Sequence, residues 1–124
     1  MIIKIYQVDA FADRIFSGNP AAVLPLGERW LEESMMQNIA MENNLPETAF
    51  YIEENNDYHI RWFTPEVEVD LCGHATLAAA HVLFNHENYK SGKVTFNSRS
   101  GFLTVKRDND MLTLDFPADD IAET

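Results

Sequence analysis

Most of this chain consists of short runs in which apolar residues alternate with polar ones or follow one another directly. Runs rich in β-branched and aromatic residues, bounded by Gly, Pro, Asn or Asp, are typical of strands. Turns between some of these runs are expected at Gly18–Pro20, Asn55–Asp57 and Asp108–Asp110. The sequence therefore predicts strands at Ile3–Ala10, Ala21–Pro25, Thr48–Glu53, Tyr58–Thr64, Val67–Leu71, Lys93–Asn97, Phe102–Lys106 and Met111–Phe116.

One segment follows a helical period instead. Between Glu28 and Glu42, the apolar residues Leu31, Met35 and Ile39 lie four positions apart, which predicts an amphipathic helix. A run of two asparagines, a leucine and a proline follows, and it is expected to end this helix.

A second helix is predicted from about Ala75 onwards. Leu77, Ala80 or His81, and Phe84 form an apolar stripe on it, and further alanines let neighbouring backbone approach closely. We expect this helix to be buried on most sides. The strand that precedes it alternates apolar and acidic residues, which predicts one core face and one acidic face.

About eight strands and two helices indicate an α+β domain in which a curled, mostly antiparallel sheet wraps the central apolar helix. At 124 residues with 46% hydrophobic content, residues 1–124 are expected to form one globular unit with a packed core. The segment Glu28–Glu42 supplies the second, amphipathic helix.

The charge and cysteine content exclude several classes of function. The chain has a net charge of −11, which repels nucleic-acid phosphates and anionic membranes, so neither is expected as a partner. The only cysteine, Cys72, cannot form an intramolecular disulfide. No apolar run has the length of a signal peptide or membrane span, so we expect a cytoplasmic protein.

The stretch Asp70–Ala80 is the leading candidate site. It is typical of a buried strand, a glycine turn and the start of an alanine-rich helix. The free backbone N–H groups of a helix start, together with its dipole, can bind a small anion without Lys or Arg. We therefore expect this turn to hold a substrate carboxylate.

Three side chains could carry chemistry. Glu47 follows a proline and precedes an apolar strand, where partial burial would suit a group that takes a proton from carbon and returns it; a solvated glutamate is the plainer alternative. His74 could polarise a substrate oxygen or cap its own helix. Cys72 could be a thiolate base or a small buried apolar residue.

Other site types have no support in the sequence. The remaining histidines, His59, His81 and His86, lack the spacing of a zinc site, so no metal is predicted. The chain also lacks a Gly-x-Ser-x-Gly nucleophile motif, a phosphate loop and a dinucleotide fingerprint. No nucleotide cofactor is therefore expected.

Four segments together resemble the N-terminal half of the phenazine-biosynthesis PhzF-like isomerase family. Their order and spacing span most of the chain, and the combined set is highly specific. They are Val8-Asp-Ala-Phe11, Gly18-Asn-Pro-Ala-Ala-Val23, Glu47-Thr-Ala-Phe50, and Phe63-Thr-Pro65 leading into Val69-Asp-Leu-Cys-Gly-His-Ala-Thr-Leu-Ala-Ala80.

The resemblance implies the fold of diaminopimelate epimerase, in which two similar lobes each wrap a sheet around a helix and the active site lies between them. This chain would be one lobe. The family's catalytic glutamate matches Glu47, which would move a proton between carbons of a small cyclic or unsaturated carboxylic acid, with no cofactor. Gly73 and His74 match positions that line the substrate, beside Cys72, and Asn19 matches a position near it.

The resemblance leaves some points open. The family's second motif belongs to the C-terminal lobe, so we expect a second lobe to complete the site and the isolated lobe to be inactive. Pro46 replaces a serine that often precedes the glutamate. Two alternatives are a Cys72-dependent amino-acid epimerase, although His74 and Ala75 replace its usual Asn-Gly pair, and a non-catalytic lobe that binds a partner or forms a homodimer. The sequence does not identify the substrate or the oligomeric state.

Overall fold

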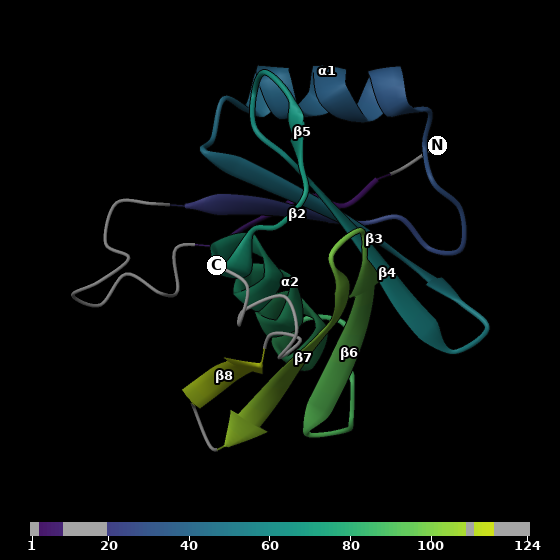
Figure 1. Ribbon diagram of the computed structural model, residues 1–124, viewed down its shortest axis with the longest axis vertical. Helices are drawn as coiled ribbons and strands as arrows, with labels where there is room; N and C mark the ends of the chain where they lie inside the picture. The colour runs from purple at the N-terminus through teal and green to yellow at the C-terminus, as the bar shows by residue number, and fades with distance from the viewer. Residues whose placement is uncertain (1–2, 9–19, 109–110, 116–124) are drawn as a thin grey trace.

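A computed structural model describes residues 3–8, 20–108 and 111–115 of the chain (Figure 1). This part of the chain forms two helices and one eight-stranded sheet, which confirms the predicted α+β class. The elements are β1 (Tyr6–Val8), β2 (Ala21–Pro25), α1 (Glu33–Asn43), β3 (Glu47–Glu54), β4 (Asp57–Phe63), β5 (Glu68–Val69), α2 (Gly73–Asn85), β6 (Lys93–Ser98), β7 (Gly101–Asp108) and β8 (Met111–Asp115).

The strands follow the order β1-β2-β3-β4-β6-β7-β8, and β5 pairs with β4 beside this path. The pairs β2–β3 and β4–β6 are parallel, whereas all other pairs are antiparallel. The sheet curls around α2, while α1 lies against its outer face (Figure 1). The predicted curled, mostly antiparallel sheet around a central helix is therefore confirmed.

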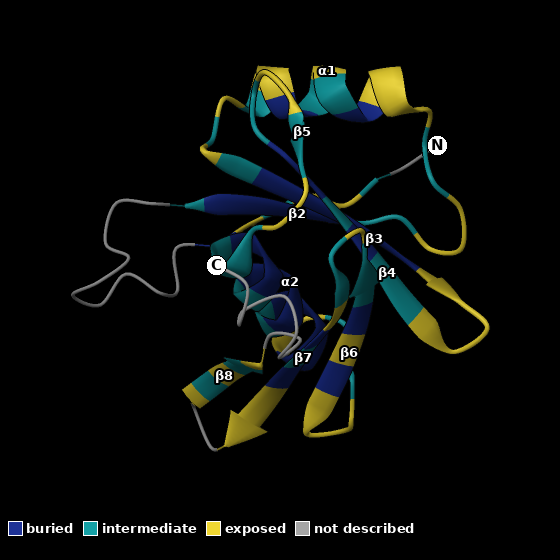
Figure 2. Ribbon diagram, viewed as in Figure 1, coloured by how far each residue is buried: buried dark blue, intermediate teal, exposed yellow. Residues whose placement is uncertain are grey.

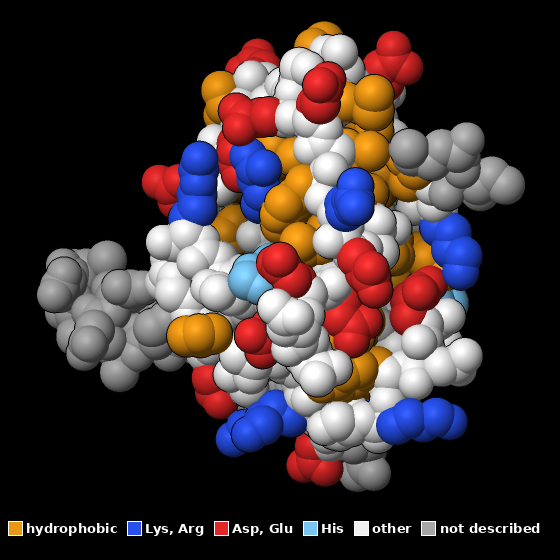
Figure 3. All heavy atoms as spheres, turned by 90° about the vertical axis from the view of Figure 1, so that its right-hand side faces the viewer, with side chains coloured by type: hydrophobic (Ala, Val, Ile, Leu, Met, Phe, Trp, Pro, Cys, Tyr) orange, Lys and Arg blue, Asp and Glu red, His pale blue; other side chains and the backbone are white. Residues whose placement is uncertain are grey.

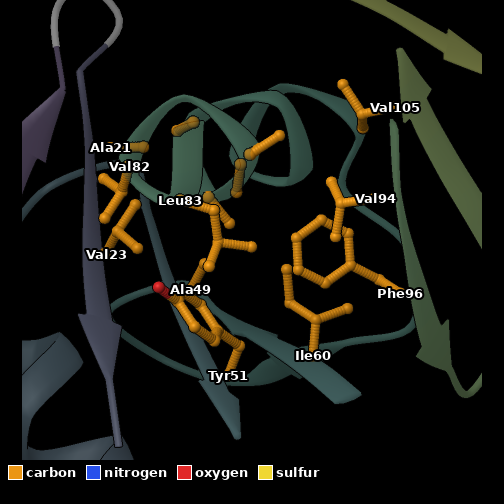
Figure 4. Packing of buried hydrophobic residues seen from close by; sticks show 14 of the residues in the cluster. Ala21, Val23, Ala49, Tyr51, Ile60, Val82, Leu83, Val94, Phe96 and Val105 are labelled. Atoms are coloured by element: carbon orange, nitrogen blue, oxygen red, sulfur yellow. The ribbon is translucent and has the colours of Figure 1, made fainter. Parts of the chain in front are cut away.

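Helix α2 forms the centre of the larger core cluster (Figures 2 and 4). Small side chains at Ala75, Ala78 and Ala79 let strands β2 and β3 pack closely against it. Its larger residues Val82 and Leu83 meet aromatic and branched side chains of the sheet, among them Tyr51, Ile60, Trp62, Val94, Phe96 and Val105. The prediction that this helix is buried on most sides is confirmed.

Helix α1 is shorter than predicted. It begins at Glu33 rather than Glu28. The backbone of Leu26 and Gly27 continues the pairing of β2 with β3 instead, through hydrogen bonds of 2.9 and 2.7 Å. Because these groups bond the neighbouring strand, they are not available to a first helical turn.

The buried stripe of α1 also differs from the prediction. Met36 and Ala40 are fully buried against the second core cluster, whereas Met35 is exposed. Leu31 precedes the helix and Ile39 is only partly buried. The four-residue spacing was right, but the face that packs on the sheet lies one position further along the chain.

The predicted strand at Val67–Leu71 is wrong in most of its length. Only Glu68 and Val69 are extended and paired, so the alternation does not continue to Val67 and Leu71, which are 55% and 40% exposed. The side chain of Glu68 is only 8% exposed, because Arg61 of β4 binds it at 2.7 Å. The acidic face of this segment is therefore partly internal.

The other predicted strands agree with the structure within a few residues. Asn55 and Asn56 both have positive φ, as the tight turn between β3 and β4 requires. The predicted turns at 18–20 and 108–110 lie wholly or partly outside the described residues. Neither helix in the described parts of the chain combines the length and the apolar character needed to cross a membrane.

Candidate functional site

Glu47 is the first residue of β3. Asn44 ends α1 with a left-handed backbone conformation, and the chain then enters β3 past Pro46. In the parallel pairing of β2 with β3, Glu47 lies opposite Ala21. Because side chains alternate along a strand, Glu47 shares the face of Ala49, which packs in the cluster around α2. The carboxylate therefore lies on the α2 side of the sheet.

The Glu47 carboxylate is only partly accessible. Its Oε1 atom is shielded from solvent and has no hydrogen-bond partner among the described residues. Buried polar atoms normally have such a partner, because leaving one unpaired costs free energy. The Oε1 atom of Glu47 is therefore an unpaired acceptor on the α2 side of the sheet.

The start of α2 is anchored to the sheet by a buried threonine. Thr76 Oγ1 donates to the carbonyl oxygen of Cys72 at 2.8 Å, and Trp62 Nε1 of β4 donates to Thr76 Oγ1 at 2.9 Å. Both Trp62 and Thr76 are almost fully buried. These bonds fix the first helical turn relative to β4.

The turn between β6 and β7 holds the chain just before α2. Ser100 Oγ donates to the carbonyl oxygen of Asp70 at 2.8 Å, and Arg99 Nη1 donates to Asp70 Oδ1 at 3.0 Å. The β6–β7 turn thus holds the segment that leads into α2, while β4 holds the first turn of the helix. These contacts hold the segment in place of the long buried strand that the sequence predicted.

Cys72 is the N-cap residue of α2, with an extended backbone, and Gly73 is the first helical residue rather than part of a turn. The pKa of the Cys72 thiol is raised to about 11, mainly by burial and also by the charge of Glu47, although the backbone N–H groups of Ala75 and His74 oppose this rise. The thiol therefore stays protonated near neutral pH. The effect of Glu47 also places its carboxylate near the start of α2.

The structure brings four of the five predicted site residues into one region. Glu47 lies on β3, and Cys72, Gly73 and His74 form the start of α2, where all three are half-buried. The fifth, Asn19, lies outside the described residues.

Sequence reasoning missed the residues that position this site. Thr76 is the single hydroxyl residue of an alanine-rich helix, and that isolation was the available signal. Trp62 and Arg99 gave no signal, because their partners lie on other elements.

Two other histidines, His81 and His86, lie at the C-terminal end of α2, away from this region. The rings of His81 and His86 lie 5.8 Å apart, and burial lowers the pKa of His81, with a further lowering from His86. Within residues 3–8, 20–108 and 111–115, no three His, Cys, Asp or Glu side chains form a group that could hold a metal ion. For the whole chain, the absence of a metal stays a prediction.

Comparison with known families gives one match that covers most of the chain. A family model described as phenazine biosynthesis-like protein matches residues 8–119. An uncharacterized isomerase of Pseudomonas aeruginosa is 57% identical over 118 residues, which are 95% of this chain and 45% of that protein. The chain therefore spans about half the length of the curated relatives it matches.

Solved structures agree with this match. A crystal structure of a phenazine biosynthesis protein of the PhzF family from Enterococcus faecalis has a TM-score of 0.84 and 57% identity. The alignment covers 91% of this chain and 43% of that one. A predicted epimerase from Pseudomonas aeruginosa has a TM-score of 0.67 at 27% identity, over 87% of this chain and 40% of that one. The epimerase-like fold expected from the sequence is thus shared by both neighbours.

Proposed function

Because this chain belongs to the phenazine biosynthesis-like protein family, we propose that it forms part of a cofactor-independent isomerase. The reaction moves a proton between two carbons of a small cyclic or unsaturated carboxylic acid. Names of relatives support the class, since the similar Pseudomonas aeruginosa protein is described as an isomerase. The assignment of the reaction to Glu47 rests on the family resemblance and on the surroundings of its carboxylate.

The observation that carries the proposal is the shielded, unpartnered Oε1 atom of Glu47 beside the start of α2. In the first step the carboxylate takes a proton from a carbon next to the unsaturated system, and the electron pair of the broken C–H bond spreads over that system. In the second step the carboxylic acid returns the proton to a different carbon. The net reaction shifts a double bond and consumes no other reactant.

The start of α2 holds the substrate in this proposal. The backbone of Gly73 and His74 forms the first turn of α2, at the positive end of the helix dipole. No acidic side chain in that turn competes with a bound anion. A substrate carboxylate bound there would place the neighbouring carbons within reach of Glu47. Asn19 is the fifth proposed contact.

We further propose that a second lobe of the same fold closes the site. The chain corresponds to 45% of a similar curated isomerase, so more than half of that relative has no counterpart here. The second lobe would exclude water and supply the remaining substrate contacts. Without it, or without a partner chain in its place, we expect no turnover.

A thiolate mechanism is less well supported. A base must be deprotonated at the working pH, and the pKa of the Cys72 thiol is raised to about 11. We therefore assign Cys72 to the wall of the site. Replacement of Cys72 by alanine should reduce turnover less than tenfold, whereas an epimerase that depends on the thiol would lose its activity.

The proposal is tested by a turnover screen with the natural polypeptide that carries this sequence. Candidate cyclic and unsaturated acids are followed by proton NMR, and the wild type is compared with Glu47→Gln and with the exposed control Glu66→Gln. We expect one acid to isomerise with the wild type and the control but not with Glu47→Gln. Full activity of Glu47→Gln would refute the proposed mechanism, and binding without turnover of any acid would favour a non-catalytic lobe.

A further inference from the structure

The turn between β6 and β7 contacts the short connection that joins β5 to α2 (Figure 1). Asp70 and Leu71 belong to this connection, which follows the paired residues of β5 and precedes the first residue of α2. Arg99 and Ser100 of the turn, 29 and 30 positions further along the chain, both contact Asp70. The approach to the helix start therefore depends on a hairpin that is remote in sequence.

The side chain of Ser98 closes this turn. Strands β6 and β7 are paired up to Ser98 and Gly101. Ser98 Oγ donates to the carbonyl oxygen of Gly101 at 2.7 Å and accepts from the backbone N–H of Ser100 at 3.1 Å. Gly101 has a φ of 103°, a conformation that residues with a side chain rarely adopt. Arg99 and Ser100 are thus presented by a hairpin whose own geometry is fixed.

Two kinds of contact join the turn to the connection. Ser100 Oγ donates to the carbonyl oxygen of Asp70 at 2.8 Å, so this bond fixes backbone rather than a side chain. Arg99 Nη1 donates to Asp70 Oδ1 at 3.0 Å, and Arg99 Nη2 lies 3.5 Å from Glu68 Oε1. Arg99 therefore bridges the acidic side chains on either side of Val69, the last residue of β5.

These contacts lie too close to solvent to add much stability. The side chains of Arg99 and Asp70 are 52% and 77% exposed, and ion pairs between such side chains contribute little to the free energy of unfolding. The bond from Ser100 is exposed as well. It nevertheless fixes the backbone two residues before Cys72, the N-cap of α2. We therefore expect the turn to affect local geometry more than stability.

The ion pair also changes the charge near the helix start. The whole chain carries a net charge of −11, and acidic side chains gather across the middle of the face shown in Figure 3. Such a field repels an anionic substrate. Asp70 is the acidic residue nearest in sequence to the N-cap Cys72, and Arg99 supplies its counter-charge.

We propose that Ser100 and Arg99 are positioning residues of the candidate active site. Ser100 fixes the backbone that leads into the first turn of α2, and Arg99 holds and neutralises the side chain of Asp70. This inference rests on the proposed function, in which that turn binds the substrate carboxylate. Both residues act through Asp70 rather than on the reacting atoms. Their loss therefore weakens substrate binding and leaves proton transfer by Glu47 intact.

The first test measures KM, kcat and urea unfolding of the natural polypeptide with the acid that turns over in the screen. Ser100→Ala removes the hydroxyl and Ser100→Thr keeps it. Ser91→Ala is the matched control, because Ser91 Oγ accepts an exposed bond from the backbone N–H of Lys93 at the other end of β6. We expect Ser100→Ala alone to raise KM, by about fivefold. All three variants should keep kcat within about twofold of the wild type and unfold at the wild-type urea midpoint.

The second test concerns the ion pair. Arg99→Gln removes one positive charge, and Lys106→Gln is its control, since it removes the same charge together with an exposed ion pair to Asp115 at 3.7 Å. We expect Arg99→Gln to raise KM about threefold, and Lys106→Gln to leave KM unchanged. Equal effects of the two variants would show that only net charge matters, which would overturn the role of Arg99.

The outcomes separate this inference from the proposed function. An unchanged KM in Ser100→Ala, or a KM in Ser100→Thr as high as in Ser100→Ala, overturns the positioning role even when Glu47→Gln is inactive. Full activity of Glu47→Gln with a raised KM in Ser100→Ala refutes the role of Glu47 and supports the positioning role.

A binding measurement makes the test independent of turnover. The same variants are titrated with benzoate, and NMR follows the backbone amides of Gly73 and His74. We expect Ser100→Ala to weaken benzoate binding about fivefold, and Ser100→Thr and Ser91→Ala to bind it as the wild type does. No acid turned over and no response of these amides to benzoate would overturn both proposals.

Discussion

Two glutamates on this sheet, Glu68 and Glu47, have opposite surroundings. The Glu68 carboxylate receives hydrogen bonds of 2.7 and 2.8 Å from Arg61, and Arg99 lies 3.5 Å away. These bonds, chiefly those from Arg61, hold its pKa below the ordinary value. Glu47 has a shielded oxygen with no partner in the described chain. The pairing of Glu68 serves stability, whereas Glu47 is the residue to which we assign the proposed proton transfer.

We therefore assign Glu68 to the stability of the fold and Glu47 to the proposed reaction. A carboxylate that an arginine binds on both oxygens contributes to the folded state and is held in its charged form, which opposes the uptake of a proton. An unpaired one weakens the fold slightly. Variants at the two positions should therefore affect different measurements.

The largest expected effect is the loss of activity in Glu47→Gln. The amide cannot accept and return a proton, so turnover should fall by at least about 10³-fold. Unfolding by urea should show stability within about 0.5 kcal/mol of the wild type, because no described hydrogen bond is lost. A large loss of stability with intact turnover would reverse the roles that we assign.

The second effect concerns stability alone. Arg61→Ala leaves the nearly buried Glu68 with little compensation, and it removes a guanidinium that lies 5.4 Å from the Trp30 ring and 5.6 Å from the Phe63 ring. Urea unfolding should show a loss of about 3 kcal/mol. As a control, Glu33→Gln removes only the exposed partner of Arg61 and should cost below about 0.5 kcal/mol.

A smaller loss is expected from Thr76→Val. The change leaves the buried Trp62 Nε1 without its acceptor, at a cost of about 2 kcal/mol, while the carbonyl of Cys72 keeps only its bond from the backbone N–H of Thr76. The matched control is Thr95→Val, which breaks an exposed bond to Thr104 and should have little effect. Equal stability of the two variants would show that the threonine does not anchor α2.

The smallest effect is a pH dependence. Because the pKa of Glu68 is lowered on folding, its contribution is present above the unfolded value near 4.5 and is lost as the pH falls through the lower folded value. Glu68→Gln should be less stable than the wild type by about 1 kcal/mol at pH 7, and the gap should shrink steadily below that value. A gap that is constant down to pH 2 would contradict the pairing.

The sequence predicted those elements whose pattern is local. The alternation in β4, the alanine-rich α2 and the Asn55–Asn56 turn depend on neighbouring residues, and all three are confirmed. The late start of α1 and the two-residue length of β5 were not predictable in this way. They depend on backbone pairing with β3 and on the contact with Arg61, which are made only in the folded chain.

The candidate site follows the same rule. Family motifs identified Glu47, Gly73 and His74, and the structure brings Glu47 to the start of α2. The anchoring through Thr76 and Trp62 joins residues 14 positions apart on different elements, so no local pattern indicates it. The roles of all five site residues stay predictions, and Asn19 also lies outside the described residues.

The most direct test of the central claim is deuterium incorporation from solvent. The acid that turns over is incubated in D₂O with the natural polypeptide, and mass spectrometry and NMR locate the label, with Glu66→Gln as the control. We predict label at the carbon that receives the proton with the wild type and the control, and none with Glu47→Gln. Equal incorporation with Glu47→Gln would contradict the assignment of proton transfer to Glu47.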